Sequence, residues 1–99
     1  MGKLVRDKIP EIIEANGTTP LTRILETEEY LACLETKLDE EVSEYHESKQ
    51  VEELADILEV VYALAEAQGY SRQQLLAVYE KKNAARGGFA KRIYWMGNR

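Results

Sequence analysis

Residues 37–59 read KLDEEVSEYHESKQVEELADILE, and this stretch decides the fold. It contains nine carboxylates among 23 residues, gathered in two groups. Each group lies within a segment whose apolar residues recur about once per helical turn. The apolar pattern lapses around residues 46–49, which predicts a tight turn. We therefore predict two helices, over residues 28–47 and 51–68, that pack side by side as an antiparallel hairpin.

The two helices carry apolar residues three and four positions apart, as expected for helices that bury one side. On the first helix these residues are Leu31, Leu34, Leu38, Val42 and Tyr45. On the second they are Leu54, Ile57, Leu58, Val61, Leu64 and Ala65. We expect both sets to face the interior.

Two further helices are predicted outside this stretch. The first covers Lys3–Ala15, with Asp7 as a cap and Pro10 in the first turn. The other covers residues 72–86 and begins with a capping box formed by Ser71 and Gln74. Thr27 is the expected N-cap of the helix over 28–47. The fold class is therefore all-α, an antiparallel bundle of about four helices in one domain over 1–99, completed by oligomerisation because the core is small.

The charges are distributed unevenly along the chain. Residues 1–80 contain all 18 acidic residues and 7 basic ones, a net charge of −11, whereas residues 81–99 contain 6 basic residues and no acid, a net charge of +6. This distribution argues against a nucleic-acid polymer as partner, since such proteins show a broad basic face. It suits a small phosphate-bearing ligand held between metal and basic side chains.

No apolar run approaches the length that crosses a bilayer, and the N-terminus lacks the features of a secretory signal. The single cysteine, Cys33, falls among apolar helical residues and favours a packing role in a reducing compartment. We therefore expect a cytoplasmic protein that does not associate with membranes.

The acidic residues of the two central helices form pairs with a spacing of three. Glu41 and Glu44 share one face of the first helix, and Glu53 and Asp56 share a face of the second with Val60. Four carboxylates brought together would repel each other, and a hard cation such as Mg²⁺ relieves that repulsion through oxygen ligands. Mn²⁺ is an alternative ion. The competing interpretation is that surface helices of an acidic protein are simply rich in glutamate.

The run Lys37-Leu38-x-Glu40-Glu41-x-x-Glu44, followed by Glu53-x-x-Asp56, resembles the signature of the MazG-like all-α nucleoside triphosphate pyrophosphohydrolases. The opening octapeptide, residues 3–10, is similar to the start of a small branch named for phosphoribosyl-ATP pyrophosphohydrolase. The resemblance covers nearly the whole chain. One departure is that only eight residues separate Glu44 from Glu53, fewer than is common in the superfamily, which leaves the substrate open.

The resemblance implies metal-dependent hydrolysis of a nucleotide at the α–β linkage, giving a monophosphate and pyrophosphate. It also implies assembly of two or more chains, with a dimer expected and a tetramer as the alternative. The Mg²⁺ ligands that it implies are Glu41, Glu44, Glu53 and Asp56. Glu40, next to them, would support the ligands or help to orient a water molecule, and Glu40 and Glu41 are the candidate catalytic residues.

Several basic or polar residues are candidates for binding phosphate. They are Lys37, Lys82, Asn83, Arg86 and Arg6, with Asp7 and Lys8 nearby. The presence of these residues also has explanations that involve no ligand. Arg6, Asp7 and Lys8 can belong to a solvated N-terminal turn. Lys37 can pair with Glu41 one turn away, and Lys82 and Arg86 suit the end of a helix that stops at Gly87.

Three other functions remain open at this point. A close variant is hydrolysis of phosphoribosyl-ATP. A non-catalytic helical module that binds nucleotide or a partner protein would use the apolar stripes and the aromatic tail, where Tyr94 and Trp95 lie. A plain structural dimer would tolerate neutralisation of the acids.

Overall fold

The computed structural model describes residues 2–99, which form four α-helices and no strand. The helices are α1 (Ile9–Ala15), α2 (Thr27–Ser48), α3 (Val51–Ala67) and α4 (Arg72–Arg86). The all-α prediction is therefore confirmed for this part of the chain. The predicted bounds of α2 and α3 were within one residue of the observed ones, and those of α4 were correct.

The capping box that starts α4 is present as predicted. The Ser71 amide donates to Gln74 Oε1 at 2.8 Å, and the Gln74 amide donates to Ser71 Oγ at 3.1 Å. The cap of α2 was predicted one residue too late, because Glu26 precedes the helix in extended conformation and no side chain caps it.

The predicted helix over Lys3–Ala15 was wrong in its first half. The helix begins at Ile9, and residues 2–8 are not helical. Asp7 is not the cap, since Lys8 occupies that position without a side-chain hydrogen bond. Pro10 explains the late start, because proline has no amide hydrogen and is tolerated only in the first turn of a helix.

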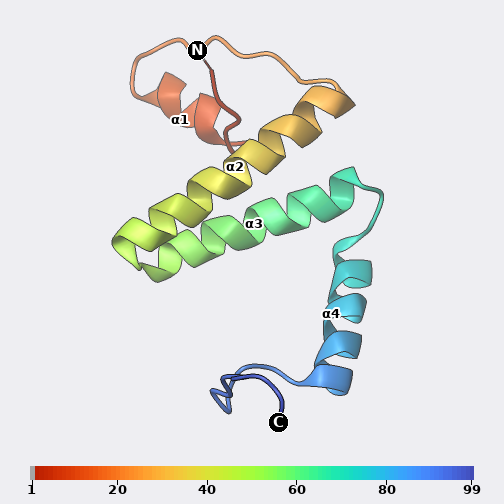
Figure 1. The fold of residues 1–99 in the computed structure, drawn as a ribbon. Coiled ribbons are helices and arrows are strands. Elements are labelled where there is room, and N and C mark those ends of the chain that lie inside the picture. Colours follow the sequence, from red (N-terminus) through yellow and green to blue (C-terminus); the bar gives the residue numbers. More distant parts are fainter. Residues whose placement is uncertain (1) are drawn as a thin grey trace.

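A two-residue connection joins α2 to α3 as an antiparallel hairpin (Figure 1). Lys49 ends α2 in the left-handed conformation, with φ 58°, and its amide donates to the Tyr45 carbonyl at 2.8 Å. A residue in this conformation closes a helix by satisfying one of its last carbonyls. The chain thus reverses directly and sets α3 against α2.

The interior of the hairpin differs from the prediction on α3. Val60 is buried with Leu34 of α2, whereas Leu54 and Leu58 are 47% and 49% exposed. The stripe of α3 that faces α2 is therefore the one that includes Glu53, Asp56 and Val60. The expectation that Leu54 and Leu58 lie inside was wrong for the single chain.

The helices do not close into a compact bundle within one chain. In the described part, helices approach each other only in the pairs α2–α3 and α3–α4, and α4 leads away from the hairpin (Figure 1). The radius of gyration is 17.7 Å, against about 13 Å for a compact domain of this length. Much of the apolar surface consequently lies uncovered.

Candidate metal centre

Three carboxylates from two helices converge inside the hairpin. Glu41 of α2 and Glu53 and Asp56 of α3 each place one carboxylate oxygen within 4.8 Å of the others. We call these three residues the acid cluster. Glu41 is buried, with only 6% of its surface exposed, and the other two are half-buried.

The hairpin explains why these residues meet. The acid cluster lies in the half of the hairpin next to the Lys49–Gln50 connection. Glu53, Asp56 and Val60 follow one another at intervals of three and four, so they share the face of α3 that packs on α2. The packing that buries Val60 therefore also turns the two acids inward.

The environment of Glu41 is unusual for a glutamate. Its Oε2 atom is buried and has no hydrogen-bond partner, and its Oε1 atom lies 3.5 Å from Lys37 Nζ. Burial raises the pKa of the Glu41 carboxyl, and the nearby Glu44 and Asp56 carboxylates raise it further, while Lys37 opposes the shift. A buried acceptor without a partner is costly, so the chain keeps this oxygen at a free-energy penalty.

A divalent cation fits this arrangement. The donors are all carboxylate oxygens, which Mg²⁺ and Mn²⁺ prefer, and the cluster offers a buried oxygen that nothing in the described chain satisfies. A cation there would also offset the mutual repulsion of the acids.

Glu44 and Glu40 are not members of the acid cluster. Glu44 is exposed, one turn beyond Glu41, and raises the pKa of Glu41 through a side-chain hydrogen bond and, to a smaller extent, through its charge. Glu40 is exposed as well. The structure thus brings together three of the four ligands proposed from sequence and leaves Glu44 at the edge.

Two of the candidate basic residues contact the cluster. Lys37 forms the ion pair with Glu41 that its spacing predicted. The Arg6 guanidinium donates to Asp56 Oδ1 at 2.6 Å, across 50 residues of sequence. Ser48, which the sequence interpretation did not include, donates to Glu53 Oε1 at 3.4 Å. Its position five residues before Glu53, across the short connection, was the available signal.

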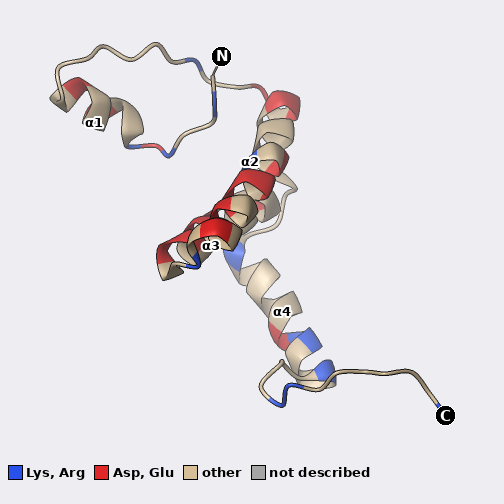
Figure 2. Ribbon diagram, turned by 60° about the vertical axis from the view of Figure 1, so that its left-hand side comes forward, with Lys and Arg blue, Asp and Glu red and all other residues tan. Residues whose placement is uncertain are grey.

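The other candidates lie elsewhere. Lys82, Asn83 and Arg86 are exposed near the end of α4, which continues from the end of α3 opposite to the acid cluster. Figure 2 shows the acidic residues along the hairpin and basic residues at the far end of α4. One chain therefore does not place these residues next to its own acids.

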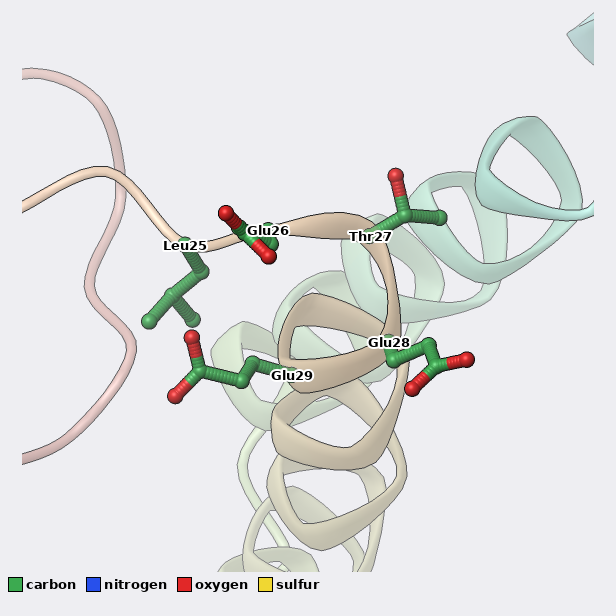
Figure 3. A pocket seen from close by; sticks show the side chains of 5 residues that line it. All are labelled: Leu25, Glu26, Thr27, Glu28 and Glu29. Atoms are coloured by element: carbon green, nitrogen blue, oxygen red, sulfur yellow. The ribbon is translucent and has the colours of Figure 1, made fainter.

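Two surface hollows lie away from the cluster. One is lined by Leu25, Glu26, Thr27, Glu28 and Glu29, where α2 begins. In Figure 3 these side chains point in different directions and do not converge. Glu29 is held by Arg23 through two hydrogen bonds, of 3.1 and 2.8 Å. The second hollow is an apolar groove between α3 and α4, lined by Val61, Leu64, Leu75 and Val78 among others.

None of the helices over residues 2–99 combines the length and the apolar character needed to span a membrane.

Comparison with known proteins gives one partial match. The chain is 59% identical over 44 residues to an uncharacterized protein from Mycolicibacterium smegmatis, a stretch covering 44% of this chain and 45% of that relative. The match therefore spans less than half of the relative's length. No family model and no solved structure matches the chain.

Proposed function

We propose that the protein is a Mg²⁺-dependent nucleotide pyrophosphohydrolase that converts a nucleoside triphosphate to the monophosphate and pyrophosphate. The observation that carries the proposal is the buried, unpartnered Glu41 oxygen among three converging carboxylates. The resemblance of the acid signature to the MazG-like superfamily supports the same reaction. Clearance of non-standard nucleotides in the cytoplasm is the role that this activity suggests.

In this proposal the acidic residues of α2 and α3 have separate roles. Glu41, Glu53 and Asp56 would hold the cation, with Glu44 as the fourth proposed ligand. When bound, Mg²⁺ neutralises phosphate charge and lowers the pKa of a coordinated water. A water oxygen attacks the α-phosphorus, the bond to the bridging oxygen breaks, and that oxygen leaves with pyrophosphate. Glu40, which is exposed and precedes Glu41 in the sequence, orients the water and takes its proton.

The proposal is tested by incubating the purified protein with Mg²⁺ and a panel of normal and modified nucleoside triphosphates, followed by product identification. We expect at least one to yield monophosphate and pyrophosphate in a reaction that EDTA stops. Phosphoribosyl-ATP is included because its hydrolysis is the close variant. If neither the panel nor phosphoribosyl-ATP gives both products, the proposed reaction is wrong.

A second copy of the chain is part of this proposal. The outer face of α3 exposes Val51, Leu54 and Leu58, and the extended shape leaves α4 without a partner on most of its surface. Exposure of this apolar face to water is unfavourable, and association of two copies would bury it. A tetramer is the larger alternative.

We expect Leu58→Asp to convert the dimer to monomers. The substitution puts an uncompensated charge into the covered face, twice per symmetric dimer, and should weaken association at least about tenfold. Light scattering across a concentration series measures it. Ser43→Asp, an exposed change on α2 of the same charge, should leave the size unaltered. A Leu58→Asp protein that remains dimeric would show that this face is not the interface.

The apolar face also favours the second candidate function, a non-catalytic module that binds a partner through α3 and the tail. The tail exposes large apolar side chains, with Phe89 98% and Trp95 76% accessible. Calorimetry separates the two functions. Partner binding that needs no metal, together with no Mg²⁺ uptake at the acid cluster, would favour the module.

A further inference from the structure

The ion pair between Arg6 and Asp56 joins the N-terminal segment, residues 2–8, to the acid cluster. The Arg6 Nη2 atom lies 2.6 Å from Asp56 Oδ1. Asp56 is a member of the acid cluster, so the guanidinium occupies the carboxylate from which a metal ion would draw a ligand. The guanidinium charge therefore already lies against a carboxylate that a bound cation would use.

This ion pair is the main polar attachment of the first part of the chain. Among the described residues 2–22, no other side chain makes a hydrogen bond or ion pair with α2 or α3. The helix α1 packs closely on none of the other described helices. Loss of the Arg6 contact should therefore loosen residues 2–8.

The pair is exposed enough to be exchanged. The Arg6 and Asp56 side chains are 56% and 38% accessible, and ion pairs in such positions contribute little to stability. Glu41 differs, because it is more than nine-tenths buried and its Oε2 atom has no partner. The cluster therefore offers a cation the buried Glu41 oxygen and the Glu53 carboxylate at once, and the Asp56 carboxylate on displacement of Arg6.

We propose that divalent metal displaces Arg6 from Asp56 and so releases the N-terminal segment from the acid cluster. A metal ion on the Asp56 carboxylate repels the guanidinium and therefore weakens this exposed ion pair. The released guanidinium is then free to contact a phosphate oxygen, which its planar donors suit. This inference rests on the proposed metal binding and adds a coupling between metal uptake and the position of residues 2–8.

The coupling is tested on the full chain with Mg²⁺ alone, by calorimetry and by backbone ¹⁵N relaxation. In the wild type, we expect Mg²⁺ to lower the order parameters of residues 3–8 below roughly 0.6. In Arg6→Ala, these residues should be mobile with or without metal, and Mg²⁺ should bind about threefold more tightly. Lys3→Ala removes an equal charge from the same segment and serves as the control for general electrostatics.

The outcomes separate the coupling from the metal site itself. If the wild type binds Mg²⁺ while residues 3–8 stay ordered, or if Lys3→Ala tightens binding as much as Arg6→Ala, the coupling is wrong and the metal site stands. If the wild type takes up no Mg²⁺, both the metal site and the coupling are wrong. Mobility that appears on Mg²⁺ addition, together with tighter binding in Arg6→Ala alone, supports the exchange.

Discussion

Glu41→Gln is expected to make the metal-free protein more stable and at the same time to abolish its Mg²⁺ uptake and turnover. Glu41 is buried and its Oε2 atom lacks a partner, so ionisation of this side chain carries a penalty in the fold. Glutamine keeps the shape, removes the charge and can donate to the neighbouring carboxylates. We expect a gain of about 1 kcal/mol in the free energy of unfolding. Urea unfolding in EDTA measures it.

The gain should depend on pH in a defined direction. Burial raises the pKa of Glu41 in the folded protein above the ordinary value of 4.5. The folded state therefore binds this proton more tightly than the unfolded state. The corresponding stabilisation is complete below pH 4.5 and is lost as the pH rises through the folded pKa. The advantage of Glu41→Gln over the wild type should accordingly be small in acid and full at neutral pH.

Glu47→Gln is the matched control, since it removes the same charge from an exposed position on the same helix. It should change stability little at any pH and leave Mg²⁺ binding intact. Equal gains from Glu41→Gln and Glu47→Gln would mean that the acidic surface as a whole, and not the buried carboxylate, destabilises the chain. A Glu41→Gln protein that still binds Mg²⁺ normally would remove Glu41 from the metal site.

The parts of the fold that sequence predicts well are those with strong local signals. The start of α4 follows from Ser71 and Gln74, which satisfy each other's amides. The α2–α3 hairpin follows from two periodic segments separated by a short lapse. The late start of α1 was also predictable. Proline is tolerated in the first turn of a helix but not in its interior, so Pro10 is incompatible with a helix that begins at Lys3.

The orientation of α3 could not be predicted from the pattern alone. Two stripes of this helix compete for the interior, and the one with Leu54 and Leu58 is the more apolar. In the single chain the stripe with Val60 and the acids faces α2 instead. If a second copy covers Leu54 and Leu58, both stripes of α3 are buried in the dimer. The apolar pattern of α3 would then indicate contacts between chains as well as contacts within one chain.

The acid cluster was predictable only in part, for a related reason. Spacing places Glu53 and Asp56 on one face, but whether that face meets Glu41 depends on how the hairpin packs. The contact between Arg6 and Asp56 could not be predicted from helical periodicity, because 50 residues separate the two. Glu44 shares the spacing of a ligand yet is exposed, so spacing alone does not decide which acids face the interior.

Chains that carry Glu41→Gln and chains that carry Arg86→Ala are expected to restore each other's activity when mixed. In one chain, the basic residues of α4 lie far along the fold from the acid cluster (Figure 2). The charges of the two parts are opposite, −11 over residues 1–80 and +6 over residues 81–99. We therefore expect the active site to combine the acid cluster of one copy with Lys82, Asn83 and Arg86 of another.

Each variant alone should be inactive, because every site then lacks one part. After the two are unfolded together and refolded in equal amounts, half of the dimers contain one chain of each kind. One of the two sites in such a dimer has both parts, so about a quarter of the wild-type activity should return. The assay uses the best substrate from the triphosphate panel, and light scattering checks that each variant forms the proposed dimer.

A control mixture of Glu41→Gln with Asp56→Asn tests whether restored activity comes from combining the acid cluster of one copy with α4 of another. Both residues belong to the acid cluster of a single chain, so no pairing of these two variants can rebuild an intact cluster. This mixture should stay inactive. If it recovers activity, the acids of one site come from two chains. If the mixture with Arg86→Ala stays inactive while that variant is correctly folded and dimeric, α4 of a second copy does not serve the site, and Arg86 acts within its own chain.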